Sequence, residues 1–495
     1  MSLSFALFNA ASGLRAQGRA AELVSGNVAN ALTPGYARRE LMLTTDIVGG
    51  NGGVRVSGIS RVVDPVVLAD RRLAEAGAGR ADTLARALKS VEQAIGEPSD
   101  PGSLSELVAR FSSRLIEASS QPDSELRLRQ AVAAARGLAE GVASTGAAIQ
   151  QMRSRADTSI AGMVERVNTA LQQVDTLNDQ ILRLGAKSRD SSALQEARQQ
   201  AIDSIAEILP IREVQRANGA VALFTGNGAT LLDGRVWELG FTAAGTVQPE
   251  MTVEAGALSS LTIGGVSVDP TGDRSLLGAG ALMAQFELRD IAGPEAQRAI
   301  DAIARDLVER FQDPAVDPSL GAGVPGLFTD GGLAFDPAAP PPPLPRPYPE
   351  EGLAQRLSIN PRIAADGADE VWRLRDGLGP AAAPGPVGDP SLIVALGERL
   401  GEARPVASGP QQGQERGFAE QVALFLSGVA TTRQAREGEA AFEGARLAGY
   451  REAEAAGGVD TDDEMQKLLV IEQNYAANAR VIQTIDLLMD ELRRI

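Results

Sequence analysis

Apolar residues near the start of the chain recur alternately three and four positions apart. The series runs from Leu3 to Val28, with Gln17 as its polar interruption. This spacing places apolar side chains along one stripe of a helix, as in a coiled-coil seam. The sequence therefore predicts a packed helix of an inner core within residues 1–40. Its seam residues are Leu3, Leu7, Ala10, Leu14, Ala21, Val24 and Val28.

A second seam with the same spacing ends the chain, and it predicts a matching core helix within residues 459–495. The acidic run from Asp460 to Glu464 suits the first helical turn, where the dipole and the free N–H groups favour negative charge. A calcium loop is a poor alternative, because the run lacks the turn glycine and distal glutamate of an EF-hand. The seam residues are Leu468, Ile471, Tyr475, Asn478, Ile482, Ile485, Met489 and Leu492.

The first helix is followed by a turn and by a β-branched stretch. In the run Thr33-Pro34-Gly35-Tyr36, proline fixes φ at the second position and glycine permits a positive φ at the third, which predicts a type II turn. Val54, Val56 and Ile59 alternate with polar residues, so we expect short strands across residues 41–78.

Helical patterning dominates residues 79–210, which we interpret as a helical rod domain. We expect helices near residues 80–95 and 103–119, then a long helix that stops at a polar cluster, Lys187 to Ser191. Ser192 and Gln195 have the spacing of a capping box, which predicts the start of a further helix.

The rest of the chain changes character several times. Turn dipeptides such as Asn227-Gly228 and Gly264-Gly265 predict an antiparallel β-module over residues 211–275. Helices are expected at 276–313, returning to the rod, and at 411–458. Residues 314–410 read as a Gly/Pro-rich linker or small irregular domain, with a polyproline spacer from Ala338 to Pro349. The predicted fold class is mainly α with β-modules (α+β), comprising a terminal coiled coil, a helical rod and an antiparallel β-domain.

Composition narrows the classes of function. The chain has 495 residues, enough for two to four domains, and contains neither cysteine nor histidine. Cys/His metal sites, thiol nucleophiles and histidine acid–base catalysis are thereby excluded, so we expect no enzyme, no metal and no cofactor. A net charge of −17 disfavours nucleic acid. No apolar stretch is long enough for membrane insertion, and no basic region precedes a signal-like core.

A rough energy comparison suggests that the two end helices need partners. Burying eight apolar side chains contributes roughly 12 to 24 kcal/mol, whereas ordering about thirty backbones costs on the order of 30 to 60 kcal/mol. The alternative is that the two helices pair inside one folded monomer. Asn27, Asn30 and Asn478 would each carry an unsatisfied amide if buried against apolar partners, and such residues can fix register. The simpler alternative is that these amides are exposed.

The two ends together resemble a known family. The N-terminal segment SGLRAQGRAAELVSGNVANALTPGYARRE and the C-terminal segment DEMQKLLVIEQNYAANARVIQTIDLLMDEL are similar to the matching ends of the rod, hook and hook-associated axial proteins of the bacterial flagellum. Asn27, Asn30, the Thr33 to Tyr36 turn, Tyr475 and Asn478 fit the family pattern. The helix-rich block at 80–209 resembles the subunits that join hook to filament.

The resemblance implies a structural, self-assembling subunit in an extracellular flagellum that transmits torque for motility. It implies type III export without a cleaved signal peptide, and ends that stay disordered until assembly. The implied partners are copies of the chain, hook protein, an adjacent hook-associated protein, the type III export apparatus, and an export chaperone at the C-terminal segment. Alternatives are another axial component such as a hook or rod protein, a rod-associated peptidoglycan hydrolase that uses two carboxylates, and a cytosolic coiled-coil scaffold.

Overall fold

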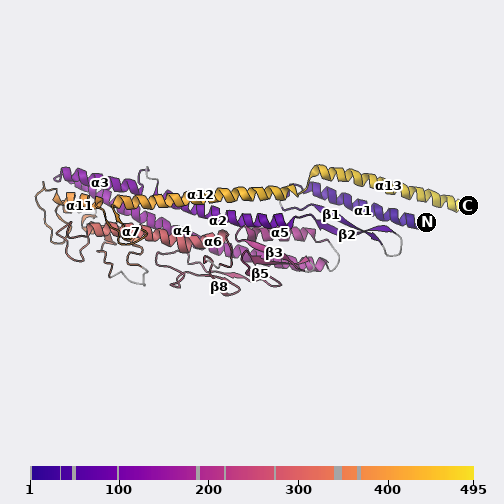
Figure 1. Cartoon of the computed structure of the whole chain (residues 1–495), viewed down its shortest axis with the longest axis horizontal. Coiled ribbons are helices and arrows are strands. Elements are labelled where there is room, and N and C mark those ends of the chain that lie inside the picture. The colour runs from indigo at the N-terminus through magenta and orange to yellow at the C-terminus, as the bar shows by residue number, and fades with distance from the viewer. Residues whose placement is uncertain are drawn as a thin grey trace.

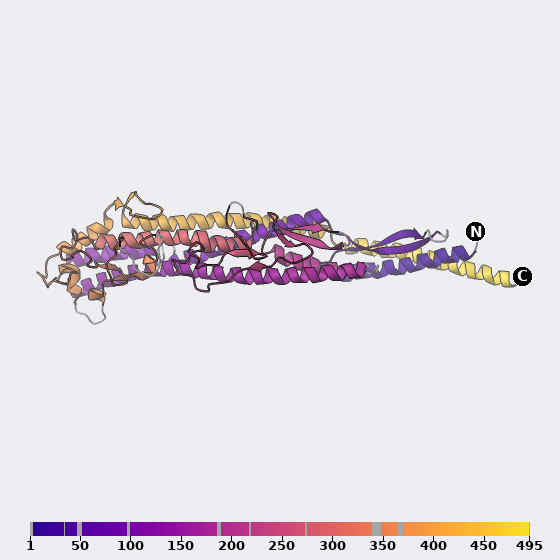
Figure 2. The ribbon, with the colours of Figure 1, turned by 90° about the horizontal axis from the view of Figure 1, so that it is seen from below.

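The chain is long and narrow, with its two termini together at one end and a helical bundle at the other (Figure 1). The computed structural model describes residues 3–33, 35–46, 52–96, 100–185, 190–216, 219–272, 275–338, 348–364 and 370–494. Helices run along the long axis in both views (Figures 1 and 2). The prediction of a mainly helical protein with small antiparallel sheets is confirmed.

The terminal unit, as we name it, consists of α1 (Leu3–Ala29), the hairpin of β1 (Arg39–Asp46) and β2 (Gly53–Arg61), and α13 (Thr461–Arg494). The strands pair antiparallel, with Arg39 opposite Arg61. The hairpin lies beside α1, and α1 packs against α13. The ends of the chain therefore pair with each other, which is the simpler of the two arrangements that the seams allow.

The rod is built on long helices that pack lengthwise. These are α2 (Pro65–Ile95), α4 (Glu125–Gly185) and α12 (Phe418–Ala456), with α5 (Ser192–Ala206) near the terminal unit. Helix α6 (Ala281–Glu287) leads through a π-turn at Leu288–Ala292 into α7 (Gly293–Phe311). Two short elements, α3 (Leu104–Ser120) and α11 (Ser391–Gly401), cover the far end of the bundle.

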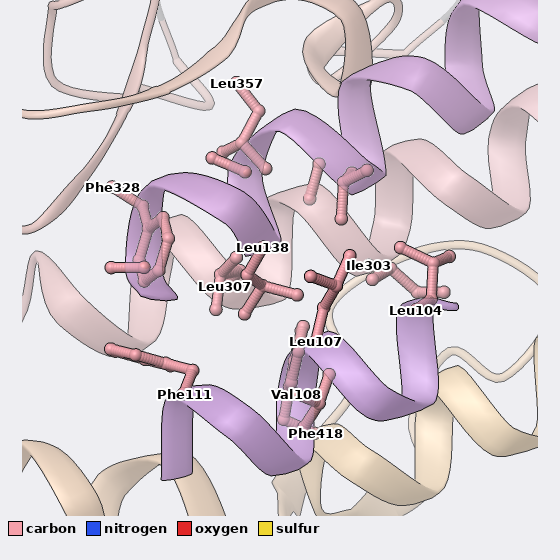
Figure 3. Packing of buried hydrophobic residues seen from close by; sticks show 14 of the residues in the cluster. Leu104, Leu107, Val108, Phe111, Leu138, Ile303, Leu307, Phe328, Leu357 and Phe418 are labelled. Carbon is pink, nitrogen blue, oxygen red and sulfur yellow. The ribbon is translucent and has the colours of Figure 1, made fainter. Parts of the chain in front are cut away.

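The main hydrophobic core lies at the far end of the rod. Phe111, Phe311 and Phe328 are fully buried, and their ring centroids lie 5.2 to 5.9 Å apart. Aromatic pairs at this separation stabilise beyond the area that they bury. Aliphatic side chains from α3, α4 and α7 pack beside them (Figure 3), among them Leu104, Leu107, Val108, Leu138, Ile303 and Leu307.

The described residues of the segment at 314–410 pack on this core, which excludes the linker and leaves the small irregular domain of the two expected alternatives. Strand β9 (Phe328–Asp330) pairs with β10 (Leu357–Ile359), and β11 (Arg404–Pro405) pairs with β12 (Glu415–Arg416). Short helical turns separate them: α8 (Leu353–Arg356), α9 (Pro361–Ala364), a 3₁₀ turn (Glu370–Trp372) and α10 (Arg373–Asp376). Buried residues such as Leu374 join the rod core. Most of the predicted polyproline spacer, residues 339–347, lies outside the described residues.

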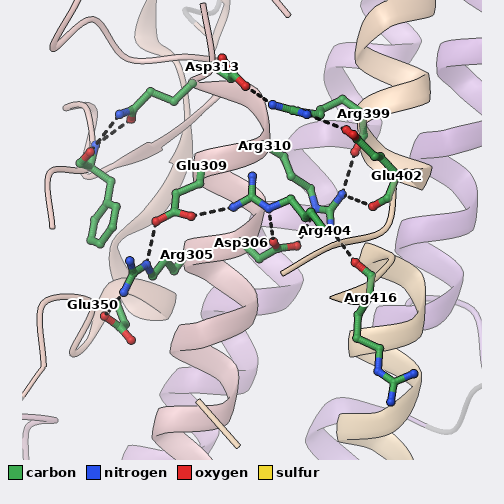
Figure 4. A network of polar contacts seen from close by, with 12 residues as sticks. Arg305, Asp306, Glu309, Arg310, Asp313, Glu350, Arg399, Glu402, Arg404 and Arg416 are labelled. Atoms are coloured by element: carbon green, nitrogen blue, oxygen red, sulfur yellow. Dashed lines mark hydrogen bonds and ion pairs between the residues drawn. The ribbon is translucent and has the colours of Figure 1, made fainter. Parts of the chain in front are cut away.

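A polar network closes the same end of the rod (Figure 4). The fully buried Arg310 donates to Asp306 and to the carbonyl oxygens of Arg399, Glu402 and Arg416. Irregular loops carry backbone acceptors that no helix or sheet satisfies, and a buried arginine can satisfy several at once. Arg310 thereby fixes the loops around α11 and β12 to α7.

The predicted β-module folds as two three-stranded antiparallel sheets. The first contains β3 (Ile211–Gln215), β4 (Val221–Thr225) and β5 (Thr230–Leu232); the second contains β6 (Leu239–Gly240), β7 (Leu261–Ile263) and β8 (Val266–Val268). Gly264 and Gly265 have φ of 58° and 82°, which suits the tight β7–β8 turn. The sheets pack on α4 and α5 through a second apolar core.

Two local predictions are wrong. Residues 65–78 belong to α2 and form no strand, because the Asp64 side chain accepts from the N–H groups of Val66 and Val67 and Pro65 occupies the first helical turn. At α5 the N-cap is Ser191, one residue earlier than expected. Gln195 donates to the Ser191 hydroxyl, and Asp190 accepts from the Ser192 N–H.

Candidate assembly site at the paired ends

The helices of the terminal unit bury only part of their predicted seams. On α1, Val24 is buried, whereas Leu3, Leu14 and Val28 are half-buried and Leu7 is exposed. On α13, Ile485 is buried. The other seam residues of α13 divide into half-buried Leu468, Ile471, Asn478 and Ile482, and exposed Tyr475, Met489 and Leu492.

A large apolar surface remains open on this pair of helices. Leu487 is 70% exposed and Leu492 is 59% exposed, and Phe5 on α1 is 47% exposed. Large exposed apolar side chains that gather on one helix indicate a surface that contacts another protein. The exposed apolar residues of α13 are Met465, Leu469, Val470, Tyr475, Val481, Leu487, Leu488, Met489 and Leu492.

Asn27 connects three parts of the terminal unit. Its side chain is 1% exposed, and its amide nitrogen donates to the Arg39 carbonyl at 3.0 Å and to Glu464 Oε2 at 2.8 Å. Its Oδ1 accepts from the Tyr36 hydroxyl at 2.9 Å and from the Arg39 N–H at 3.0 Å. Both amide hydrogens and both lone pairs are used, so the amide expected to be unsatisfied or exposed is buried at no cost in lost hydrogen bonds.

The turn after α1 brings Tyr36 to Asn27. The Tyr36 N–H donates to the Thr33 carbonyl at 3.1 Å, and Gly35 has φ +77°, as the third position of a type II turn requires. Pro34 lies outside the described residues. The Arg39 guanidinium lies 5.1 Å from the centre of the Tyr36 ring, a cation–π contact. Burial raises the pKa of the Tyr36 phenol, which keeps it a hydrogen-bond donor.

The other two predicted asparagines behave differently. Asn30 donates to the Gly26 carbonyl at 2.9 Å and accepts from the Thr33 hydroxyl, so it shapes the end of α1. Asn478 donates to the Asn474 carbonyl and lies over Gly13, where an added Cβ would be 3.0 Å from its amide nitrogen. Gly13 therefore permits α1 and α13 to approach closely at this point.

Glu464 has a role that its position in the sequence hides. Asp460 caps α13 by accepting from the N–H groups of Asp462 and Asp463, as the acidic run predicts. Glu464, however, is 2% exposed, and it accepts from Asn27 and from Lys467 Nζ at 2.7 Å. An acidic residue in a first helical turn gives no sign of such a partner, because that partner lies 437 residues away.

An ion pair fastens the terminal unit to the rod. Arg39 of β1 pairs with Glu196 of α5 at 2.8 Å. Within the rod, Arg71 of α2 pairs with Glu454 at 2.7 Å, close to the end of α12. The first pair fixes the hairpin to the rod, and the second holds α2 against α12.

The described residues contain no helix with the length and apolar character needed to cross a membrane. Within those same residues, no group of three or more carboxylates lies close enough to hold a metal ion.

Two models of flagellar protein families match parts of this chain. The family model described as flagellar hook-associated protein FlgK helical domain matches residues 88–314, and the one described as flagellar basal body rod FlgEFG protein C-terminal matches residues 455–495.

Individual relatives agree with these matches. Flagellar hook-associated protein 1 of Escherichia coli is 21% identical over 100% of both chains. The Bacillus subtilis protein of that name is 26% identical over 61% of this chain, and the match spans 64% of the relative. A solved structure titled as the flagellar hook junction protein FlgK from Burkholderia pseudomallei shares the fold, with a TM-score of 0.58 and 11% identity, over 78% of this chain and 99% of that one.

Paired terminal helices on a helical rod, together with these matches, define a structural protein of the flagellar axis. Within that class, the chain matches flagellar hook-associated protein 1, and it does so over the full length of the Escherichia coli relative. It is therefore a component of the flagellum.

Proposed function

We propose that this chain joins the flagellar hook to the filament by helical self-assembly and transmits torque between them. The observation that carries the proposal is the apolar surface left open on α1 and α13 after they have paired. Neighbouring copies would cover that surface and form a tube. The relatives are named as a hook-associated protein and a hook junction protein, which supports this choice over a hook or rod subunit.

In this proposal the exposed side chains and the buried polar residues of the terminal unit have different roles. The exposed side chains of α13 contact neighbouring copies, hook protein or the adjacent hook-associated protein. Asn27, Tyr36 and Glu464 hold the pair in register. Before assembly the C-terminal segment binds an export chaperone, and the chain passes unfolded through the type III apparatus. The role is mechanical and requires no catalytic step.

Two substitutions test the proposal. Leu487→Asp and Leu492→Asp place charges on the open face of α13 while leaving its contact with α1 unchanged. We expect both variants to be exported, to keep the wild-type melting temperature of the rod, and to lower the amount of this protein in purified hook–filament structures at least tenfold. Ile116→Asp on α3, where Ile116 is 65% exposed, is the matched control at the far end of the rod.

A chain that lacks most of α13 provides a second test of the proposed assembly surface. Deleting residues 468–495 should abolish incorporation and leave the rod folded by circular dichroism. Wild-type incorporation of Leu487→Asp and Leu492→Asp would refute the proposed surface. Strong hydrogen-exchange protection of α1 and α13 in the free monomer would contradict the expectation that neighbours order them.

A further inference from the structure

A cavity lies where the hairpin of the terminal unit meets the rod. It has a volume of about 410 Å³ and is lined by residues of β2, α2, α5 and β3. The lining includes the aliphatic side chains of Leu68 and Ile202. It also includes Arg61, Arg72 and Arg198, one from each of β2, α2 and α5.

Arg72 is the most constrained of these arginines. Its side chain is 3% exposed, its Nε lies 2.7 Å from Asp203, and its Nη1 lies 2.7 Å from Glu213. Its Nη2 is buried and has no hydrogen-bond partner among the described residues. A buried guanidinium N–H without an acceptor is costly, and a cavity beside it gives an acceptor room to bind.

Arg61, which also lines the cavity, has a buried N–H without a hydrogen-bond acceptor as well. Its Nη2 donates to Gln199 Oε1 at 2.7 Å, whereas its buried Nε lies 3.8 Å from Glu196 and has no hydrogen-bond partner in the part of the chain that the structure describes. Both unsatisfied N–H groups therefore belong to residues that line one cavity.

Three guanidinium groups and one carboxylate, Glu213, line the cavity, and Glu213 is already bound by Arg72 and Gln215. Two carboxylates outside the lining offset this charge, because Asp203 pairs with Arg72 and Glu196 lies 3.8 Å from Arg61. Burial lowers the pKa of Arg61 and of Arg198; Glu196 and Glu213 oppose this effect, while nearby guanidinium groups add to it. The buried N–H groups of Arg61 and Arg72 that lack an acceptor, and not a net positive charge, are therefore what the cavity offers to an anion.

We propose that this cavity binds a small tetrahedral oxyanion, such as phosphate or sulfate, through Arg61 and Arg72, with Arg198 supplying positive charge. Guanidinium groups bind such anions by charge-assisted hydrogen bonds, which are about twice as strong as neutral ones. Pro65 and Gln215 are exposed at the cavity wall, so the anion can enter from solvent. Once bound, it ties the hairpin to α2 and α5 and stiffens the connection between the terminal unit and the rod.

Calorimetric titration of the full chain with inorganic phosphate at constant ionic strength tests the proposal. We expect saturable binding of one anion with a dissociation constant on the order of 1 mM, a similar value for sulfate, and at least tenfold weaker binding of acetate. Equal affinity for acetate would overturn the assignment of a tetrahedral anion. The absence of saturable binding would overturn the site itself.

Variants locate the binding. Arg61→Gln should weaken phosphate binding at least tenfold. The control Arg216→Gln removes a guanidinium that is 44% exposed and lies outside the cavity lining, and it should leave binding unchanged. Val63→Glu supplies a carboxylate from the half-buried cavity wall, so this variant should fold and lose the response to phosphate. If Arg61→Gln does not fold, Val63→Glu decides: undiminished phosphate binding in that variant would refute the proposal.

Discussion

Replacing Arg289 by methionine tests whether a buried ion pair holds the β-module to the rod. Arg289 and Asp157 are both fully buried, with Nη1 2.8 Å from Oδ1. Asp157 also accepts from the N–H groups of Ala244 and Gly245. Arg289 forms a further ion pair with Asp290 and donates to the Ser259 carbonyl. The Arg289–Asp157 pair thus connects α4, the π-turn and the loop between β6 and β7 of the β-module.

The expected loss in stability follows from the charge left behind. Removing one partner of a buried pair costs about 3 to 5 kcal/mol, because the other charge stays buried without its counter-ion. In Arg289→Met, Asp157 keeps its two backbone donors, which places the cost toward the lower end of that range. Asp157→Asn in the same chain removes the fully buried carboxylate, so the double variant should recover about 1 to 2 kcal/mol relative to Arg289→Met.

Urea unfolding at pH 7 measures these differences, and with Trp372→Phe in every variant the remaining tryptophan, Trp237, reports on the second core that it packs against. Arg216→Met is the control, since Arg216 and Asp233 are 44% and 42% exposed and such pairs contribute about 0 to 1 kcal/mol. A loss below about 1 kcal/mol in Arg289→Met, or strictly additive effects in the double variant, would refute the assigned coupling.

Two further predictions concern the rod. Burial raises the pKa of Asp301 from 3.8 to about 7, against the opposing hydrogen bonds from Gly352 and Ala354. Between about pH 4 and pH 7, Asp301 keeps its proton in the folded state and loses it in the unfolded state. The free energy of unfolding therefore falls as the pH rises through this range. Thermal unfolding at pH 5, 6, 7 and 8 should show a fall that is absent in Asp301→Asn. Phe111→Ala should destabilise the rod by about 3 to 5 kcal/mol in chemical denaturation, because the ring is fully buried against Phe311 and Phe328; a loss near zero would mean that the core repacks.

The terminal helices and the β-module could be predicted from local patterns. The seams of α1 and α13 depend on periodicity within one helix, and the β-module depends on turn glycines such as Gly264 whose conformation is set locally. The start of α2 also had a local signal, the pair Asp64-Pro65, which was outweighed by the β-branched residues around it.

Contacts between distant parts of the chain were not accessible in this way. Asn27 and Glu464 are each ordinary in their own helix, and only the folded chain brings them within 2.8 Å. The Gly/Pro-rich composition of residues 314–410 left open whether they form a linker or a small irregular domain, whereas buried side chains such as Leu374 join that region to the rod core. Composition describes backbone stiffness, whereas packing depends on which apolar residues meet in space.

The chain passes between the rod and the terminal unit twice, after β2 at residues 62–64 and after α12 at residues 457–460. A part held by one flexible peptide could spin about it freely, whereas two short parallel connections permit bending but resist rotation about the long axis. Bending at the two connections also separates Arg39 from Glu196 and Arg61 from Gln199, which join the hairpin to α5. Covalent and non-covalent links thus cross the same boundary, and a twist applied to one part passes to the other.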